Sequence, residues 1–196
     1  MNKETENAVY KLLDRIGMTY SVLHHEEAFT MEICEGIEKE LGAPICKNLF
    51  LCNRQQTDFY LLLMPGKKVF KTKYLSSQLG CARLSFAGEE FMLSLLHIKP
   101  GSVSPMGLMN DTENKVRLII DKALIEREQS GACSNYAEHE EARPKVKDLM
   151  EDKEFGCHPC VNSATLKLGM QEFLDKFLPA VHHDYTIVDL PNETEQ

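Results

Sequence analysis

Two short apolar runs on either side of a polar turn constrain the fold of this chain more than any other feature. The runs cover residues 47–52 and 59–64, and the stretch between them, residues 53–58, holds no large apolar side chain. Two such runs joined by a short polar stretch are typical of an antiparallel β-hairpin. A hairpin disfavours a doubly wound parallel sheet. The sequence therefore predicts an α/β (α+β) fold in which helices cover a mixed sheet.

The remaining elements follow from the spacing of the apolar residues. Helical spacing predicts helices over residues 8–16, 31–41, 72–79, 89–96 and 173–178. The second of these carries Ile33, Ile37 and Leu41 on one face, with Thr30 at the position of its N-terminal cap. Short apolar runs predict further strands over residues 20–23, 82–86, 115–120 and 185–190.

The length and composition fit one ordinary globular domain. A chain of 196 residues can bury a sizeable core, and 43% hydrophobic with 27% charged residues argues against disorder over most of it. Residues 125–154 differ, because they hold nine acidic and five basic residues with little apolar periodicity. We therefore expect a single domain over residues 1–196, with an exposed insertion at 125–154.

The net charge limits the kinds of partner that the protein can bind, and the cysteine content indicates its cellular compartment. A formal net charge of −8 argues against non-specific binding to long nucleic acids, which requires the neutralisation of many phosphates. Lys67, Lys68, Lys71 and Lys73 occur with no acidic residue between them, and they either face a few phosphates or form a solvated stretch. The N-terminus lacks an apolar signal segment, and the seven cysteines fit a reducing compartment. We expect a cytoplasmic protein without a membrane partner.

Lys47 and Asn48 open the first strand of the predicted hairpin, directly before three large apolar residues. An ammonium group at this position needs a carboxylate, a carbonyl or a ligand oxygen, because burying it without a partner is costly. The alternative is a lysine whose stem packs on the sheet while its head reaches solvent.

A Gly-x-x-x-Pro loop is the second motif that can carry chemistry, and it consists of Gly101, Ser102, Val103, Ser104 and Pro105. Glycine permits a backbone that a side chain would block, and proline fixes φ, so the peptide groups between them can face a ligand. An ordinary surface loop is the alternative.

His158 is the third candidate, because the following proline holds its backbone extended. An ordinary histidine pKa of about 6.5 lets the ring donate or accept a hydrogen bond near neutral pH. Asn162 lies four residues further on and could orient His158 or the loop. The alternatives are a structural histidine and an asparagine that satisfies its own backbone in a turn.

Taken together and in this order, these patterns resemble the YbaK/ProX family, whose members hydrolyse mischarged aminoacyl-tRNA. The resemblance is carried by Lys47-Asn48-Leu49-Phe50, by the loop 101–105 with Asn110-Asp111 after it, and by residues 158–162. It covers nearly the whole chain, and residues 125–154 are its main gap. It implies a three-layer fold around a curved mixed sheet.

The resemblance also implies roles for individual residues. Lys47 matches the active-site lysine, and Asn48 resembles the asparagine of the branch that acts on alanyl-tRNA(Pro). The loop 101–105 would contact the terminal adenosine and the aminoacyl ester, and His158 would lie at the pocket wall. A segment bordering the pocket matches Phe29, Thr30 and Met31.

The function implied is deacylation of mischarged alanyl-tRNA(Pro) by a metal-free mechanism without a cofactor, in which the terminal ribose hydroxyl accepts the proton. The partners implied are the acceptor end of tRNA(Pro) and prolyl-tRNA synthetase. A cysteinyl-tRNA(Pro) deacylase and a non-catalytic module that binds tRNA or the synthetase are the alternatives.

Other chemistries have less support. The sequence has no Gly-x-Ser-x-Gly elbow, no His-Glu-x-x-His motif and no P-loop. A zinc or thiol redox protein is a further alternative, because Cys133, His139, Cys157 and Cys160 supply four residues of the types that bind zinc. Cysteines that simply pack in the core explain the same residues.

Overall fold

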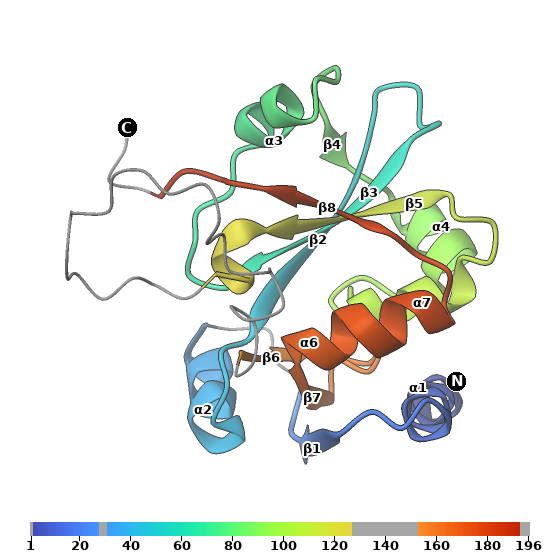
Figure 1. The fold of residues 1–196 in the computed structure, drawn as a ribbon, viewed down its shortest axis with the longest axis vertical. Coiled ribbons are helices and arrows are strands. Elements are labelled where there is room, and N and C mark those ends of the chain that lie inside the picture. Colours follow the sequence, from blue (N-terminus) through green and yellow to red (C-terminus); the bar gives the residue numbers. More distant parts are fainter. Residues whose placement is uncertain (1, 28–30, 127–152, 193–196) are drawn as a thin grey trace, which may run out of the picture.

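The computed structural model describes residues 2–27, 31–126 and 153–192. Its strands form two sheets (Figure 1). The larger sheet has five strands in the order β4-β2-β3-β5-β8, and the smaller has three in the order β1-β7-β6. The predicted α/β fold with a mixed sheet covered by helices is confirmed, and its strands are divided between these two sheets.

The predicted hairpin lies at the centre of the larger sheet. Strands β2 (Cys46–Cys52) and β3 (Phe59–Pro65) pair antiparallel along their whole length. In the turn, the side-chain Oδ1 of Asn53 accepts a hydrogen bond from the backbone N–H of Thr57 at 2.9 Å. The sheet is mixed because β4 (Ser85–Phe86) is antiparallel to β2, whereas β5 (Val116–Asp121) and β8 (Tyr185–Val188) are added in parallel.

The smaller sheet is antiparallel and consists of β1 (Tyr20–His24), β7 (Ala164–Gly169) and β6 (Glu154–Cys157). A parallel bridge between Ile45 and Gly156 joins it to the larger sheet. A Cβ at Gly156 would lie 3.0 Å from Leu41 Cδ2 and 3.1 Å from Ile45 Cγ1, so the glycine allows this close approach. The bridge fixes the start of β2 against the end of β6.

Helices lie on both faces of the larger sheet (Figure 1). One continuous helix, composed of α6 (Met170–Glu172), the π-helical turn η4 (Phe173–Phe177) and α7 (Leu178–Ala180), runs between the two sheets. The others are α1 (Asn2–Arg15), α2 (Met31–Leu41), α3 (Thr72–Gln78), α4 (Glu89–Phe91) with the π-helical η1 (Met92–Leu96), and the short 3₁₀ helices η2 (Pro105–Asn110) and η3 (Lys122–Leu124). None of these helices combines the length and apolar character that a membrane span requires.

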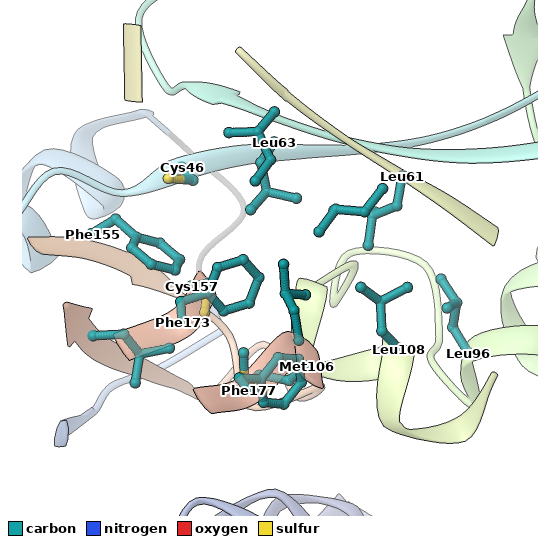
Figure 2. Close-up of a cluster of buried hydrophobic side chains, with 14 of the residues drawn as sticks. Cys46, Leu61, Leu63, Leu96, Met106, Leu108, Phe155, Cys157, Phe173 and Phe177 are labelled. Carbon is teal, nitrogen blue, oxygen red and sulfur yellow. The ribbon is translucent and has the colours of Figure 1, made fainter. Parts of the chain in front are cut away.

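The main core fills the space between the sheets (Figure 2). Leu61 and Leu63 of β3 meet Phe155 of β6, and Phe173 and Phe177 of the helix between the sheets close the cluster. A second, smaller cluster includes Leu51, Leu62 and Leu75, through which α3 packs on the other face of the larger sheet. Each of these buried side chains contributes about 1.5–3 kcal/mol of transfer free energy, so both faces stabilise the sheet.

Most of the predicted elements are confirmed, with four differences. Ile33 was expected on the buried face of α2, but it is 38% exposed because the packing of this helix is centred on Ile37 and Leu41. The predicted strand over residues 82–86 pairs only at Ser85 and Phe86. Strands β6 and β7 are not among the predicted elements, because their alternation, as in Thr165-Leu166-Lys167-Leu168, extends over only about four residues. Thr30 and most of the predicted insertion lie outside the described residues.

Candidate functional site

The bridge between the two sheets brings together the segments that carry Lys47 and His158. Ile45 pairs with Gly156, so the residues that follow them, Cys46 and Cys157, also lie side by side. Both cysteine side chains enter the main core (Figure 2). Lys47 follows on the opposite face of β2, and His158 follows the end of β6. Two motifs that are far apart in the sequence therefore meet at one end of the larger sheet.

The ammonium group of Lys47 is held by the backbone of a neighbouring segment. Its Nζ donates a hydrogen bond to the carbonyl oxygen of Lys68 at 2.9 Å, and the residue is half-buried. An ammonium group has three N–H donors, and the described residues accept from one of them. The remaining donors can meet a ligand oxygen, so the lysine has the carbonyl partner that the sequence analysis required.

A buried ion pair anchors the segment that holds Lys47. Lys68 Nζ lies 2.9 Å from Asp121 Oδ2 and donates to Asp121 Oδ1 at 3.0 Å, and both side chains are almost fully buried. Asp121 Oδ1 also accepts the backbone N–H of Ala123 at 3.0 Å. The carbonyl that binds Lys47 therefore belongs to a residue whose side chain is anchored by a buried ion pair at the end of β5.

Asn48 faces the opposite side of β2 from Lys47. It shares that side with Cys46 and Phe50, and its Nδ2 makes only a long 3.4 Å contact with the carbonyl of Cys46. Its Oδ1 is buried and has no hydrogen-bond partner among the described residues. The structure does not bring the two predicted catalytic side chains of this motif together.

His158 is oriented through one ring nitrogen. Nδ1 lies 2.8 Å from the carbonyl of Ala164, which can only accept, so Nδ1 carries the proton and Nε2 of the neutral ring is an acceptor. Burial lowers the pKa of His158 below its ordinary value, the hydrogen bond to Ala164 opposes this effect, and electrostatic interaction with nearby His25 lowers the pKa further. The two imidazole rings are 6.2 Å apart between centroids. At neutral pH His158 is uncharged.

The loop 101–105 is attached directly to the His158 segment. The hydroxyl of Ser104, which is fully buried, donates to the carbonyl of His158. The same oxygen accepts the N–H of Met106 at 3.1 Å and so caps η2, with Pro105 at the first helical position. Gly101 has φ 84°, a conformation that favours glycine. Two of the three predicted motifs are therefore in direct contact.

A cleft lies beside this contact. Its volume is about 530 Å³, and its walls include Ser102 from the loop and Asn162 from the segment after His158. Cys160, Val161, His97 and Lys99 complete this side of the cleft. Val103 is partly buried against the main core instead. The cleft is the described cavity in which residues of two predicted motifs face the same space.

The predicted site residues at the start of α2 are only partly described. Phe29 and Thr30 lie outside the described residues, and Met31 is the first residue of α2. Asn110 and Asp111, which follow the loop, have structural partners. Asn110 Nδ2 donates to the carbonyl of Leu96 at 2.8 Å, and Asp111 Oδ2 accepts the N–H of Val116 at 2.7 Å.

The cysteines of the zinc hypothesis face the core. Cys157 and Cys160 are buried, and burial raises the pKa of the Cys157 thiol to about 12 and that of the Cys160 thiol still higher. Zinc binds the thiolate, which such environments disfavour. Cys133 and His139 lie outside the described residues, and within the described part no group of three or more His, Cys, Asp or Glu residues could hold a metal ion.

Sequence reasoning missed the partners that orient the predicted residues. Asp121 ends an apolar strand and Lys68 follows a Pro-Gly turn, and these are the only sequence signals of their buried ion pair. His25 was also missed. Its Nε2 accepts from the hydroxyl of Thr165 at 2.9 Å, because its Nδ1 donates to the carbonyl of Glu26.

Comparison with known proteins gives consistent results. Residues 25–140 match the family model of the aminoacyl-tRNA editing domain. A protein of Acetoanaerobium sticklandii named prolyl-tRNA editing protein ProX is 28% identical over 190 residues, covering 97% of this chain and 100% of that protein. A Danio rerio protein named prolyl-tRNA synthetase associated domain-containing protein 1 is 27% identical over 188 residues, covering 96% of this chain and 86% of that protein.

Solved structures share the fold. The structure of a candidate trans-editing enzyme for prolyl-tRNA synthetase superposes with a TM-score of 0.61 at 17% identity, covering 96% of this chain and 97% of that one. A structure used to graft epitope backbones onto scaffold proteins superposes with a TM-score of 0.62, also at 17% identity, with the same coverage. At this identity the likeness concerns the arrangement of strands and helices.

Proposed function

Because the chain belongs to the aminoacyl-tRNA editing domain family, we propose that it is a trans-editing hydrolase that deacylates mischarged alanyl-tRNA(Pro). The names of its relatives in Acetoanaerobium sticklandii and Danio rerio, which refer to prolyl-tRNA editing and to prolyl-tRNA synthetase, support tRNA(Pro) as the RNA. The amino acid is the finer part of the proposal and rests on the Lys47-Asn48 pair.

One observation carries the proposal. The bridge between Ile45 and Gly156 brings the Lys47 segment to the His158 segment, and the hydroxyl of Ser104 binds the His158 carbonyl. The backbone segments that carry the three motifs are therefore neighbours, although the Lys47 ammonium lies on the opposite face of β2 from Cys46, and neither Lys47 nor His158 lines the cleft beside the loop. This set of groups suits an ester whose carbonyl must be polarised and whose attacking water must be positioned.

Lys47 acts electrostatically in this mechanism. Water attacks the carbonyl carbon of the aminoacyl ester, and negative charge develops on the carbonyl oxygen. A fixed ammonium group stabilises this charge more in the transition state than in the ground state, which is what lowers the barrier. Lys47 is fixed because Nζ is bound to the Lys68 carbonyl, and that segment is anchored by Asp121.

The proton of the attacking water passes to a group of the substrate. The ester bond to the terminal ribose breaks, the ribose oxygen takes a proton, and the free amino acid leaves. In this proposal the neighbouring ribose hydroxyl relays this proton, because it accepts the proton from water and donates its own to the departing ribose oxygen. Neutral His158, with Nδ1 bound to Ala164, offers Nε2 as a hydrogen-bond acceptor that can orient the substrate hydroxyl or the water.

Specificity follows from the size of the pocket. A synthetase gains only about 1–3 kcal/mol of discrimination from one methylene, so a second site that excludes the larger correct amino acid completes the selection. We assign the pocket wall to Phe29, Thr30 and Met31, with Asn48, and the contact with the terminal adenosine to residues 101–105 and Asn162. A pocket that admits alanine and excludes proline would spare correctly charged tRNA(Pro).

The test is a deacylation assay with tRNA(Pro) charged in turn with alanine, cysteine, serine and proline, at one enzyme concentration with and without a chelator. We expect rapid, chelator-insensitive loss of alanine and no loss of proline. Preferential loss of cysteine would reassign the substrate to cysteinyl-tRNA(Pro). Loss of none of the four would refute a hydrolase and favour a module that binds tRNA or the synthetase.

A further inference from the structure

A groove lined by basic and aromatic side chains lies at the edge of the larger sheet. Its volume is about 1010 Å³, and we call it the basic–aromatic groove. The β2–β3 turn, the start of α3 and the segment leading into β4 meet there (Figure 1). It is lined by Arg54, Phe70, Lys71, Thr72, Lys73, Arg83, Leu84, Ser85 and Phe86.

The charge of this groove is opposite to that of the whole chain. The chain has 30 acidic and 22 basic residues, whereas four of the nine residues lining the groove are basic and none of these nine is acidic. Arg54, Lys71, Lys73 and Arg83 are all exposed. Such a local excess of positive charge on an acidic protein indicates a polyanionic ligand.

The predicted run of four lysines does not explain the groove. Lys68 is buried in its ion pair with Asp121, and Lys67 lines a different surface hollow beside Pro44 and Ala43. Only Lys71 and Lys73 of the run reach the groove, where the fold adds Arg54 and Arg83 from other segments. The positive surface is therefore created by the fold, and it differs from the one that the sequence suggests.

An exposed aromatic ring lies among these charges. Phe86 is 63% exposed, which is unusual for a large apolar side chain, and it forms an edge-on pair with Phe70 at 6.3 Å between ring centroids. Phe70 packs against the smaller core cluster and supports this arrangement. A supported aromatic ring within a basic groove is the combination that binds an unstacked base together with its phosphates.

The groove lies on the same face of the sheet as Lys47. Phe86 is paired with Leu51 of β2, and residues directly paired in an antiparallel sheet share a face. Lys47 precedes Leu51 by four residues on the same strand and so shares its face, about 13 Å away at 3.3 Å per residue. Leu51 between them is buried in the smaller cluster, so a strand bound in the groove would reach the lysine only by passing over the residues that cover this cluster.

We propose that the basic–aromatic groove binds the acceptor end of the aminoacyl-tRNA, with phosphates on its four basic side chains and an unstacked base against Phe86. The inference deepens the proposed function and rests on it, since it names the surface by which the substrate RNA is held. The ligand chemistry is an RNA strand with at least one unstacked base.

The first experiment measures binding and needs no catalysis. Uncharged tRNA(Pro) carrying a fluorophore is titrated with the wild type, with Lys73→Ala/Arg83→Ala, with Phe86→Ala, and with the control Lys11→Ala/Arg15→Ala, whose residues are exposed on α1. We expect the basic double variant to lower the slope of log K against log salt by about 1.4–1.8, and Phe86→Ala to weaken binding about 5-fold or more. The control should match the wild type.

The second experiment separates this inference from the proposed function. Hydrolysis of alanyl-tRNA(Pro) is compared with hydrolysis of alanine esterified to adenosine, which is too small to fill the groove. The groove variants should lose kcat/KM at least about 10-fold on the tRNA and less than 2-fold on the small ester. Equal tRNA binding by all variants, or an equal loss in the control, would overturn the groove as the RNA site. A wild type that binds tRNA through the groove without hydrolysing either ester would overturn only the proposed function.

Discussion

The two ends of strand β2 differ in what surrounds them. The end with Phe50, Leu51 and Cys52 is buried on both faces, because one face enters each apolar cluster. The end with Lys47 and Asn48 is half-buried, and the Lys47 ammonium donates to the carbonyl of Lys68. One strand thus supplies stability at one end and chemistry at the other.

This difference suggests that residues only a few positions apart on one strand serve different purposes, some for stability and others for catalysis. The buried end depends on apolar contacts, which are insensitive to charge. The polar end depends on the hydrogen bond from Lys47 to the Lys68 carbonyl, whose partner lies 21 residues further along the chain. Substitutions at the two ends should therefore affect different measurements.

Phe50→Ala should give the largest effect and should act on stability. Phe50 is 1% exposed and stacks on Phe59 at 5.8 Å between centroids, so the truncation leaves a cavity in the main core. We expect a loss of about 3–5 kcal/mol in the free energy of unfolding, measured by urea titration. The exposed Phe86→Ala is the matched control and should cost less than about 0.5 kcal/mol. Equal losses in the two variants would contradict the comparison.

Lys47→Ala should act on catalysis. Removing a fixed donor from a developing oxyanion costs about 2.7–4 kcal/mol of transition-state stabilisation, which is roughly 100- to 1000-fold in kcat. The urea midpoint should change little, because the side chain is half-buried and makes one hydrogen bond to the described residues, to the Lys68 carbonyl. Lys67→Ala, an exposed lysine nearby, is the control and should keep full activity. The measurement is single-turnover deacylation of alanyl-tRNA(Pro). A normal rate in Lys47→Ala would show that the lysine has no part in the mechanism.

Asp121→Asn should lower both the free energy of unfolding and the rate of deacylation. At this residue, stability and catalysis cannot be separated. The variant leaves the Lys68 ammonium buried without its carboxylate, which costs about 3 kcal/mol, the lower end of the range for a broken buried pair. Because the Lys68 carbonyl positions Lys47, deacylation by the folded fraction should also decrease. Glu113→Gln, in the exposed pair with Lys115, is the matched change and should leave the free energy of unfolding almost unchanged, because solvent screens this pair. An Asp121→Asn protein with normal stability and activity would show that the ion pair positions nothing.

The pH dependence of stability should show the smallest effect. The pKa of His158 is lowered in the folded protein and returns to about 6.5 on unfolding, so between these values the unfolded state binds the proton. The free energy of unfolding should therefore decrease as the pH falls through 6.5, and His158 should add nothing further below its folded pKa. The size is at most about 1.4 kcal/mol per unit of pKa difference.

His158→Gln should remove this part of the acid sensitivity. Urea midpoints of the wild type and the variant, compared at pH 7.5 and 5.5, isolate the contribution of this one side chain. His24→Gln, at a side chain that is 68% exposed, is the control and should follow the wild type. A wild-type curve parallel to that of His158→Gln would mean that the histidine is not buried as a neutral group.

Much of the fold could be predicted because its signals are local. The hairpin, the first and last helices and most strands show a period of two or 3.6 in their apolar residues. Strands β6 and β7 were missed because the alternation of their apolar residues extends over only about four residues each. The partners in the site could not be predicted for a related reason. Lys68 and Asp121 are 53 residues apart, and nothing in either local sequence specifies the other.

Charged surfaces, like the partners in the site, could not be located from the local sequence. Lys67 and Lys68 are neighbours in the sequence, yet one is exposed and the other is buried in an ion pair. Arg54 and Arg83, which no local pattern connects with Lys71, line one groove with it. The positions of charges along the chain thus indicate the presence of a basic surface without locating it.

The single bridge between Ile45 and Gly156 has a consequence for biosynthesis. At about 5–20 residues per second, Gly156 is added to the growing chain roughly 5–20 s after Ile45. Until then the hairpin can form, but Lys47 has no neighbour at position 158 and β1 has no β7 to pair with. A nascent chain that stalls in this interval would carry the lysine without β6 and β7, so this region can assemble only after those strands have been synthesised.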